Sequence, residues 1–244
     1  MNADNGLAPL EDAATVVLLR DGASGPEVLM LERPSKGGSF AGAWVFPGGK
    51  VDPEDKPTGM AQGASKGTAD AAELAAARTA GAREVAEETG QQLAADALVP
   101  LSNWLPMRAL KRRFRTWFFL AEAASSGVVL NPGEHGAYAW LTPARALARH
   151  AAGTMLLMPP TWVTLHHLSG AASVADALAA ARGAKPADYR TYVLSDDGGA
   201  DELVVWAGDE DYPPGGELAP AGGRHRLYAG TLPWRYEHSR PAAS

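Results

Sequence analysis

The part of this sequence best suited to chemistry is a short acidic run that contains Arg83, Glu84, Glu87 and Glu88. Steps of three and four residues separate the glutamates, so on a helix their carboxylates share one side. The run falls near the C-terminal end of its helix, where the helix dipole disfavours acids. Such a cluster stabilises a fold poorly but suits a hard cation such as Mg²⁺, which prefers oxygen ligands. A solvated acidic helix face is the alternative interpretation.

Strong helix formers surround this run and predict a helix over residues 71–89. Gly90 stands where a helix-ending glycine belongs. Asp70 and Glu73 have the spacing of a capping box, with Asp in place of the usual Ser or Thr. We therefore expect the helix to begin just after Asp70, with Glu73 acting as a cap.

Short aliphatic and aromatic runs elsewhere in the chain predict strands. Two of them flank a turn-forming stretch and form a hairpin, and a third ends abruptly at Pro47. The residues from Lys50 to Asp70 show no hydrophobic period and predict a long surface loop. Thr142 and Pro143 are typical of a helix start. The predicted strands are 14–20, 27–32, 43–46, 113–123 and 136–141, the further helices are 142–150, 161–168 and 174–182, and a β-rich segment begins at 190.

The glycine pair after Pro47 and the acidic helix together resemble the Nudix box. Its pattern is G-x5-E-x7-R-E-U-x-E-E-x-G-U, where U is aliphatic. The segment REVAEETG at 83–90 matches the helical half, and Gly48 and Gly49 match the glycines before it. The resemblance implies an α/β fold, an α/β/α sandwich around a mixed β-sheet, here followed by a β-rich C-terminal extension. It also implies a hydrolase that cleaves a phosphoanhydride bond with water.

The resemblance gives the matching residues roles in a metal-dependent reaction. A bound cation would neutralise the diphosphate and lower the pKa of the attacking water. Arg83 would orient the glutamates through ion pairs. Glu88 and Glu134 are both candidates for the general base. The cation would be Mg²⁺, with Mn²⁺ as a substitute, and its ligands would be Glu84, Glu87, Glu88 and the carbonyl of Gly49.

The sequence departs from the box in its first half. The residues from Lys50 to Asp70 insert between the glycines and the helix, so the G-x5-E spacing is broken. Ala75 stands eight residues before the arginine, where the pattern has Glu. Whether Glu73 or Asp52 replaces that glutamate is left open.

The segment before the glycine pair resembles the coenzyme A diphosphatase branch of the family, in its peroxisomal type and bacterial relatives. That branch carries L-L-T-x-R-[SA]-x3-R-x3-G-x3-F-P-G-G, which Arg33, Gly42 and residues 46–49 match. Gly38 stands where the branch has its second arginine. Coenzyme A or an acyl derivative is therefore the first substrate expected, with ADP-ribose and NADH-type dinucleotides as alternatives. The expected substrate-binding residues are Arg33, Phe46, Gly48, Arg112 and Arg113.

A basic cluster at residues 108–115 stands out in an acidic chain. On a strand, Arg113, Arg115, Trp117 and Phe119 share one face. Such a face could bind a nucleotide, because arginine binds phosphate and an aromatic ring stacks on a base. Pairing of these arginines with neighbouring acids is an alternative that the sequence leaves open.

Composition excludes several other classes of protein. With 244 residues, 46% of them apolar, the chain can bury a large core. The net charge of −6 argues against a nucleic-acid or anionic-membrane partner. The absence of cysteine removes thiolate chemistry. We expect a hydrolase domain over residues 1–184, with residues 185–244 as an extension packed on the same domain.

No apolar run in the sequence is long enough to span a bilayer, and the N-terminus has no basic leader region. We therefore expect a cytoplasmic protein whose partner is a small-molecule nucleotide substrate, and homodimerisation is left open. A non-catalytic ligand sensor with the same fold is the alternative to an enzyme. The complete set of three glutamates favours catalysis, because a sensor has no need of a full metal cluster.

Overall fold

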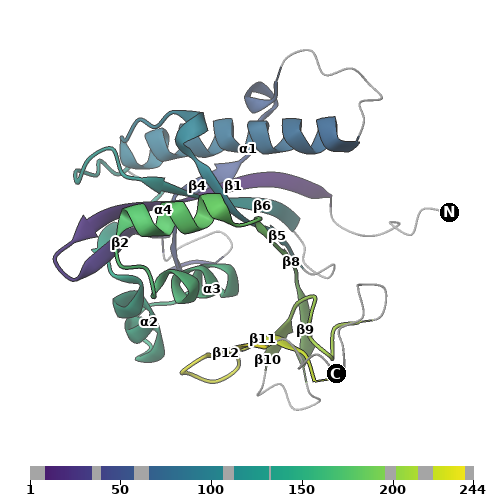
Figure 1. The fold of residues 1–244 in the computed structure, drawn as a ribbon. Helices are drawn as coiled ribbons and strands as arrows, with labels where there is room; N and C mark the ends of the chain where they lie inside the picture. The colour runs from purple at the N-terminus through teal and green to yellow at the C-terminus, as the bar shows by residue number, and fades with distance from the viewer. Residues whose placement is uncertain are drawn as a thin grey trace.

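Helices lie on both faces of a central mixed sheet in the computed structural model (Figure 1), which describes residues 9–34, 40–57, 66–106, 113–131, 133–195, 202–213 and 222–239. The sheet has eight strands, with the order β3-β2-β1-β6-β5-β8, and β4 pairs with β1 while β7 pairs with β2. Its strands are β1 (Leu10–Gly22), β2 (Gly25–Glu32), β3 (Trp44–Val45), β4 (Gly48–Lys50), β5 (Val99–Leu105), β6 (Arg113–Glu122), β7 (Ala137–Leu141) and β8 (Ala187–Arg190).

The centre of this sheet is the parallel pair of β1 and β6, in which Leu10 lies opposite Arg113 and Leu19 opposite Glu122. β1 also pairs antiparallel with β4, where Ala14 lies opposite Gly49. This short pairing places the glycine pair at the middle of the sheet, directly below the acidic helix.

Side chains alternate between the two faces of the sheet, as the strand period requires. Val16 and Leu18 of β1 pack toward α1 (Lys66–Thr89), together with Phe119. Val17 and Leu19 pack toward the opposite face. That face is covered by α2 (Pro143–Ala151), α3 (Pro159–Leu168) and α4 (Val174–Gly183), below the sheet in Figure 1. The predicted α/β/α sandwich around a mixed sheet is therefore confirmed.

A second, four-stranded antiparallel sheet follows, with the order β12-β11-β10-β9. Aromatic rings join it to the first sheet: Trp104 of β5 stacks on Tyr189 at 3.9 Å between ring centroids and meets Trp206 edge-on at 5.8 Å. The predicted β-rich C-terminal extension is confirmed, although the boundary at residue 184 stays a prediction. The strands of this sheet are β9 (Tyr192–Ser195), β10 (Glu202–Val205), β11 (Arg224–Tyr228) and β12 (Arg235–Ser239).

Most predicted elements are present, but the start of the acidic helix was predicted wrongly. α1 begins at Lys66, so Asp70 lies inside it and is no cap. Glu73 instead pairs with Arg115 at 2.7 Å and accepts a hydrogen bond from the Trp117 indole at 3.1 Å. Glu73 therefore lies inside the helix and contacts β6 instead of capping the helix start. The cap at Thr142 is confirmed, since its side chain accepts from the Arg145 N–H.

Sequence analysis missed β4, β5, β8 and β12, as well as two short 3-10 helices, η1 (Pro53–Asp55) and η2 (Ala95–Ala97). η1 lies within the stretch that was predicted to be a loop. Among the helices that the structure describes, none is long and apolar enough to cross a membrane.

Candidate active site

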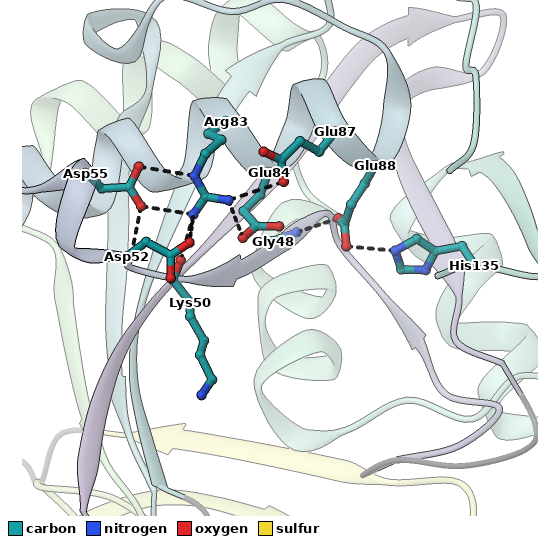
Figure 2. A network of polar contacts seen from close by, with 9 residues as sticks. All are labelled: Gly48, Lys50, Asp52, Asp55, Arg83, Glu84, Glu87, Glu88 and His135. Carbon is teal, nitrogen blue, oxygen red and sulfur yellow. Dashed lines mark hydrogen bonds and ion pairs between the residues drawn. The ribbon is translucent and has the colours of Figure 1, made fainter. Parts of the chain in front are cut away.

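The acidic run lies on the C-terminal half of α1, above β4, and Arg83 is at the centre of its polar contacts (Figure 2). The Arg83 guanidinium donates from Nη1 to Glu84 at 2.9 Å and to Glu87 at 3.3 Å. It also donates from Nη2 to the carbonyl oxygen of Lys50 at 3.0 Å. The arginine therefore fixes two of the three glutamates relative to β4, as the ion-pairing role expected of it requires.

Asp55 holds the other side of this guanidinium. Its two carboxylate oxygens accept from Arg83 Nε at 3.2 Å and Nη2 at 2.9 Å, which is the bidentate geometry that arginine and carboxylate favour. The residue is only 5% exposed, and the backbone N–H of Asp52 donates to it at 2.9 Å. Burial raises the pKa of this carboxyl, but the hydrogen bonds from Arg83 and Asp52 outweigh it, so the pKa is below the ordinary 3.8.

Asp55 also fills the place for which sequence analysis considered Glu73 and Asp52. Glu73 contacts β6, and Asp52 is a more distant, half-exposed neighbour of Arg83 at 3.4 Å. Counted from Gly49, the G-x5-E step of the box ends on Asp55. The insertion therefore falls after Asp55 and before the helix, which is why Ala75 stands eight residues before Arg83.

Glu84 is half-buried beside Gly49. A Cβ added at Gly49 would lie 2.2 Å from Glu84 Oε1, so the absence of a side chain there lets the carboxylate reach the strand. Burial raises the pKa of Glu84, the hydrogen bond and charge of Arg83 lower it, and the charges of Glu88 and Glu87 raise it again. The net pKa lies above the ordinary 4.5. The charges of the neighbouring glutamates therefore add to the effect of burial on this carboxyl.

Glu88 is the most enclosed of the three glutamates. Its Oε2 accepts from the backbone N–H of Gly48 at 2.8 Å, and its Oε1 lies 2.8 Å from His135 Nε2 (Figure 2). Sequence analysis missed His135, because it precedes β7 and no local pattern connects it to α1. The adjoining Glu134, which was a candidate base, is exposed.

The three glutamates fit a hard divalent cation, because such a cation prefers carboxylate oxygens and these lie on one face of α1. A bound cation would also offset the repulsion between their charges. Within the described ranges, however, no group of three or more acidic, histidine or cysteine side chains is arranged to hold a metal ion. The carboxylates are instead hydrogen-bonded to other side chains: Arg83 holds Glu84 and Glu87, and His135 holds Glu88. Glu87, whose side chain is 53% exposed, is free to turn toward a cation with little resistance from its surroundings.

The expected substrate-binding residues lie in different environments. Phe46 is 3% exposed and meets Phe118 edge-on in the core, so its ring has no free surface for a ligand. Arg33 is exposed at the end of β2. Arg113 is buried at the start of β6, and Arg112 lies outside the described residues.

The predicted alternation along β6 is confirmed, because Phe119 packs toward α1 and Phe118 toward the opposite face. Arg115 on the α1 side is paired with Asp12 at 2.8 Å and with Glu73. Arg115 therefore pairs with neighbouring acids, which was the alternative to nucleotide binding.

Asp55→Asn is expected to destabilise the fold at pH 7 by about 1 to 3 kcal/mol, because a charged acceptor of Arg83 is lost. The carboxyl has a lower pKa in the folded than in the unfolded chain, so its contribution is present above the unfolded pKa and is lost as pH falls through the folded value. The difference between wild type and variant should therefore shrink below pH 3.8. Urea unfolding at pH 7 and at acidic pH measures it, and a difference independent of pH would contradict the assignment.

The chain resembles known proteins in sequence and in fold. The family model described as NUDIX domain matches residues 9–157. A NUDIX hydrolase from Alicyclobacillus acidocaldarius has a similar structure, with a TM-score of 0.59 and 23% identity over 70% of this chain and 96% of that chain. A MutT NUDIX hydrolase from Burkholderia pseudomallei gives a TM-score of 0.44 and 22% identity over 65% of this chain and 97% of that chain. No curated protein matches the chain. At this identity, the first structural match shows a shared fold.

Proposed function

This chain belongs to the NUDIX family of hydrolases, which act on pyrophosphate bonds, and on that premise we propose that it cleaves the diphosphate of a nucleoside-diphosphate-linked molecule with Mg²⁺ as cofactor. The observation that carries the proposal is the arrangement of three glutamates and one arginine on α1 beside the glycine pair of β4. Mn²⁺ is expected to substitute for Mg²⁺, since it accepts the same oxygen ligands.

In this proposal Glu84, Glu87 and Glu88 hold the cation with the carbonyl of Gly49. When bound, the cation neutralises the diphosphate and lowers the pKa of a water molecule. The water oxygen attacks one phosphorus, the bridging P–O bond breaks, and two phosphate-bearing products leave. Throughout these steps Arg83, anchored by Asp55, keeps the glutamates on the β4 side of the helix.

A general base must accept the proton of the attacking water. Glu88 is one of the proposed ligands of the cation and is largely buried, whereas the side chain of Glu134 is exposed and has no ligand role in this proposal. Glu134 is therefore the base that we propose, with Glu88 as the alternative.

We propose coenzyme A or an acyl derivative as the substrate, with ADP-ribose and NADH-type dinucleotides as the alternatives. Coenzyme A carries a 3′-phosphate, which an exposed cation near the site can bind. Arg33 is suitably placed, because the carbonyl of the preceding Glu32 accepts at 2.9 Å from the N–H of Gly136, next to His135. Its own N–H donates to the carbonyl of Ala43 at 2.9 Å, which fixes the backbone and leaves the side chain at the surface.

Arg33→Ala is expected to raise KM for coenzyme A about tenfold to hundredfold, because a charge-assisted bond to phosphate contributes roughly 1.5 to 3 kcal/mol. KM for dephospho-coenzyme A should stay the same, since that molecule lacks the 3′-phosphate. Both are measured with Mg²⁺ by detection of the phosphate-bearing products, with ADP-ribose and NADH in the same panel and EDTA as the metal-free control.

Two results of this panel would count against the proposals. Equal weakening for the two forms of coenzyme A, or a wild-type preference for ADP-ribose, would remove coenzyme A as the substrate. Turnover in EDTA equal to that in Mg²⁺ would remove the metal-dependent mechanism.

A further inference from the structure

His135, which lies just before β7, contacts Glu88 at the C-terminal end of α1. Its Nε2 lies 2.8 Å from Glu88 Oε1, while the backbone N–H of Gly48 donates to Oε2 at 2.8 Å. The imidazole is 5% exposed and the carboxylate side chain 9%. The carboxylate is thus held from two directions in a place that solvent barely reaches.

Strand register, and not α1, sets the position of His135. The next residue, Gly136, donates its N–H to the carbonyl of Glu32, and Ala137 lies opposite Glu32 where β7 pairs with β2. Glu88 is therefore approached by β4 on one side and by the start of β7 on the other. Both strands belong to the same sheet, so the two donors keep a fixed separation.

The partners determine which ring nitrogen carries the proton. A carboxylate accepts only, so His135 must donate from Nε2–H. The other nitrogen, Nδ1, is buried and has no hydrogen-bond partner among the residues that the structure describes. Glu88 is thus the one polar partner found for this ring, and a substitution at position 135 removes no other hydrogen bond seen here.

We propose that His135 is a positioning residue for the hydrolysis: it donates to Glu88 and fixes the direction of the carboxylate lone pairs that remain for the cation. Two carboxylate oxygens offer about four acceptor sites. The bonds from Gly48 and His135 use two of them, which leaves acceptor sites on both oxygens. The buried ring has almost no surface for substrate, so it acts through Glu88. This inference rests on the proposed function.

Two substitutions test the role. His135→Leu removes the donor, whereas His135→Gln keeps an N–H near the position of Nε2. Mn²⁺ binding to the metal-free protein is measured by calorimetry without substrate, and kcat and KM are measured separately. We expect His135→Leu to weaken Mn²⁺ binding about tenfold or more, as is usual when the hydrogen-bond partner of a ligand is lost. Its kcat should fall while KM stays the same, and His135→Gln should restore most of both losses.

His150 provides a control, because it is also a histidine with little exposure but lies in α2, where its Nδ1 is 3.0 Å from the carbonyl of Met155. His150→Leu should lower the melting temperature and leave Mn²⁺ affinity unchanged. If His135→Leu does not fold, His135→Asn replaces it, since the shorter amide draws the donor away from Glu88 and should weaken Mn²⁺ binding in the same way.

The outcomes separate this inference from the proposed function. A wild type that neither binds Mn²⁺ nor hydrolyses any substrate of the panel overturns both. A wild type that does both, with His135→Leu or His135→Asn equal to it in Mn²⁺ affinity and kcat, overturns the role of His135 and leaves the function standing. Weaker Mn²⁺ binding that His135→Gln restores supports the role.

Discussion

Glu87→Gln is expected to lower kcat by a factor on the order of 10² or more while the melting temperature stays the same, because a charged ligand of the catalytic cation is lost. The structure makes this residue the cleanest test of the cluster. Its side chain is 53% exposed, and the contact found for it is the bond from Arg83 at 3.3 Å. An exposed ion pair of this kind contributes little stability, so a loss of rate reports on the reaction.

Glu27→Gln is the matched control for this measurement. Glu27 also forms a salt bridge with an arginine, Arg20 at 2.7 Å, but on the hairpin of β1 and β2 and away from α1. Its substitution should change neither kcat nor the melting temperature by much. If Glu87→Gln behaves like Glu27→Gln, the acidic run is a solvated helix face and the metal-dependent mechanism is wrong.

Gly49→Ala is expected to reduce kcat by a factor on the order of 10², because misplacement of a catalytic group by about 1 Å has effects of this size. The new Cβ would lie 2.2 Å from Glu84 Oε1, which is far inside contact distance. The obstacle is the end of a flexible side chain, so Glu84 can turn away and the fold survives. Rate and thermal unfolding measured on one preparation should therefore show a large loss of activity and a small loss of stability.

The neighbouring substitution, Gly48→Ala, should give a different balance. Its Cβ would lie 2.3 Å from the carbonyl oxygen of Ala14, a backbone atom of the central strand that cannot turn away. We expect a loss of about 1 to 3 kcal/mol from overpacking, and with it a fall of several degrees in melting temperature. Equal loss of stability in the two variants would show that Gly49 has a backbone role instead of making room for Glu84.

The parts of the site that sequence analysis predicted are those that depend on local spacing. Arg83 and the glutamates share a helix face because of the helical period alone. The mixed sheet between helices followed from the resemblance to the Nudix box. The first residue of α1 was predicted wrongly from local capping. Glu73, the expected cap, instead contacts Arg115 and Trp117 of β6, and this tertiary contact is not visible in the local sequence.

The missed residues are those that reach the site through tertiary structure. Asp55 contacts Arg83 across an insertion, so its distance from the helix in sequence concealed it. His135 reaches Glu88 because of the register of β7 on β2, which no short pattern encodes. Phe46 lies in a matching motif yet packs in the core. Motif position therefore predicted the acidic helix better than it predicted the contacts around that helix.

The parallel pairing of β8 with β5 has a consequence for self-association. β5 would otherwise be an edge strand, and an edge strand presents unpaired backbone groups on which a strand of another chain can assemble. β8 covers the part of β5 from Ser102 to Leu105. It is only four residues long and carries an exposed ion pair between Asp188 and Arg190, features that make a poor template for further pairing. The C-terminal residues thus protect the sheet that carries the site from aggregation at this edge.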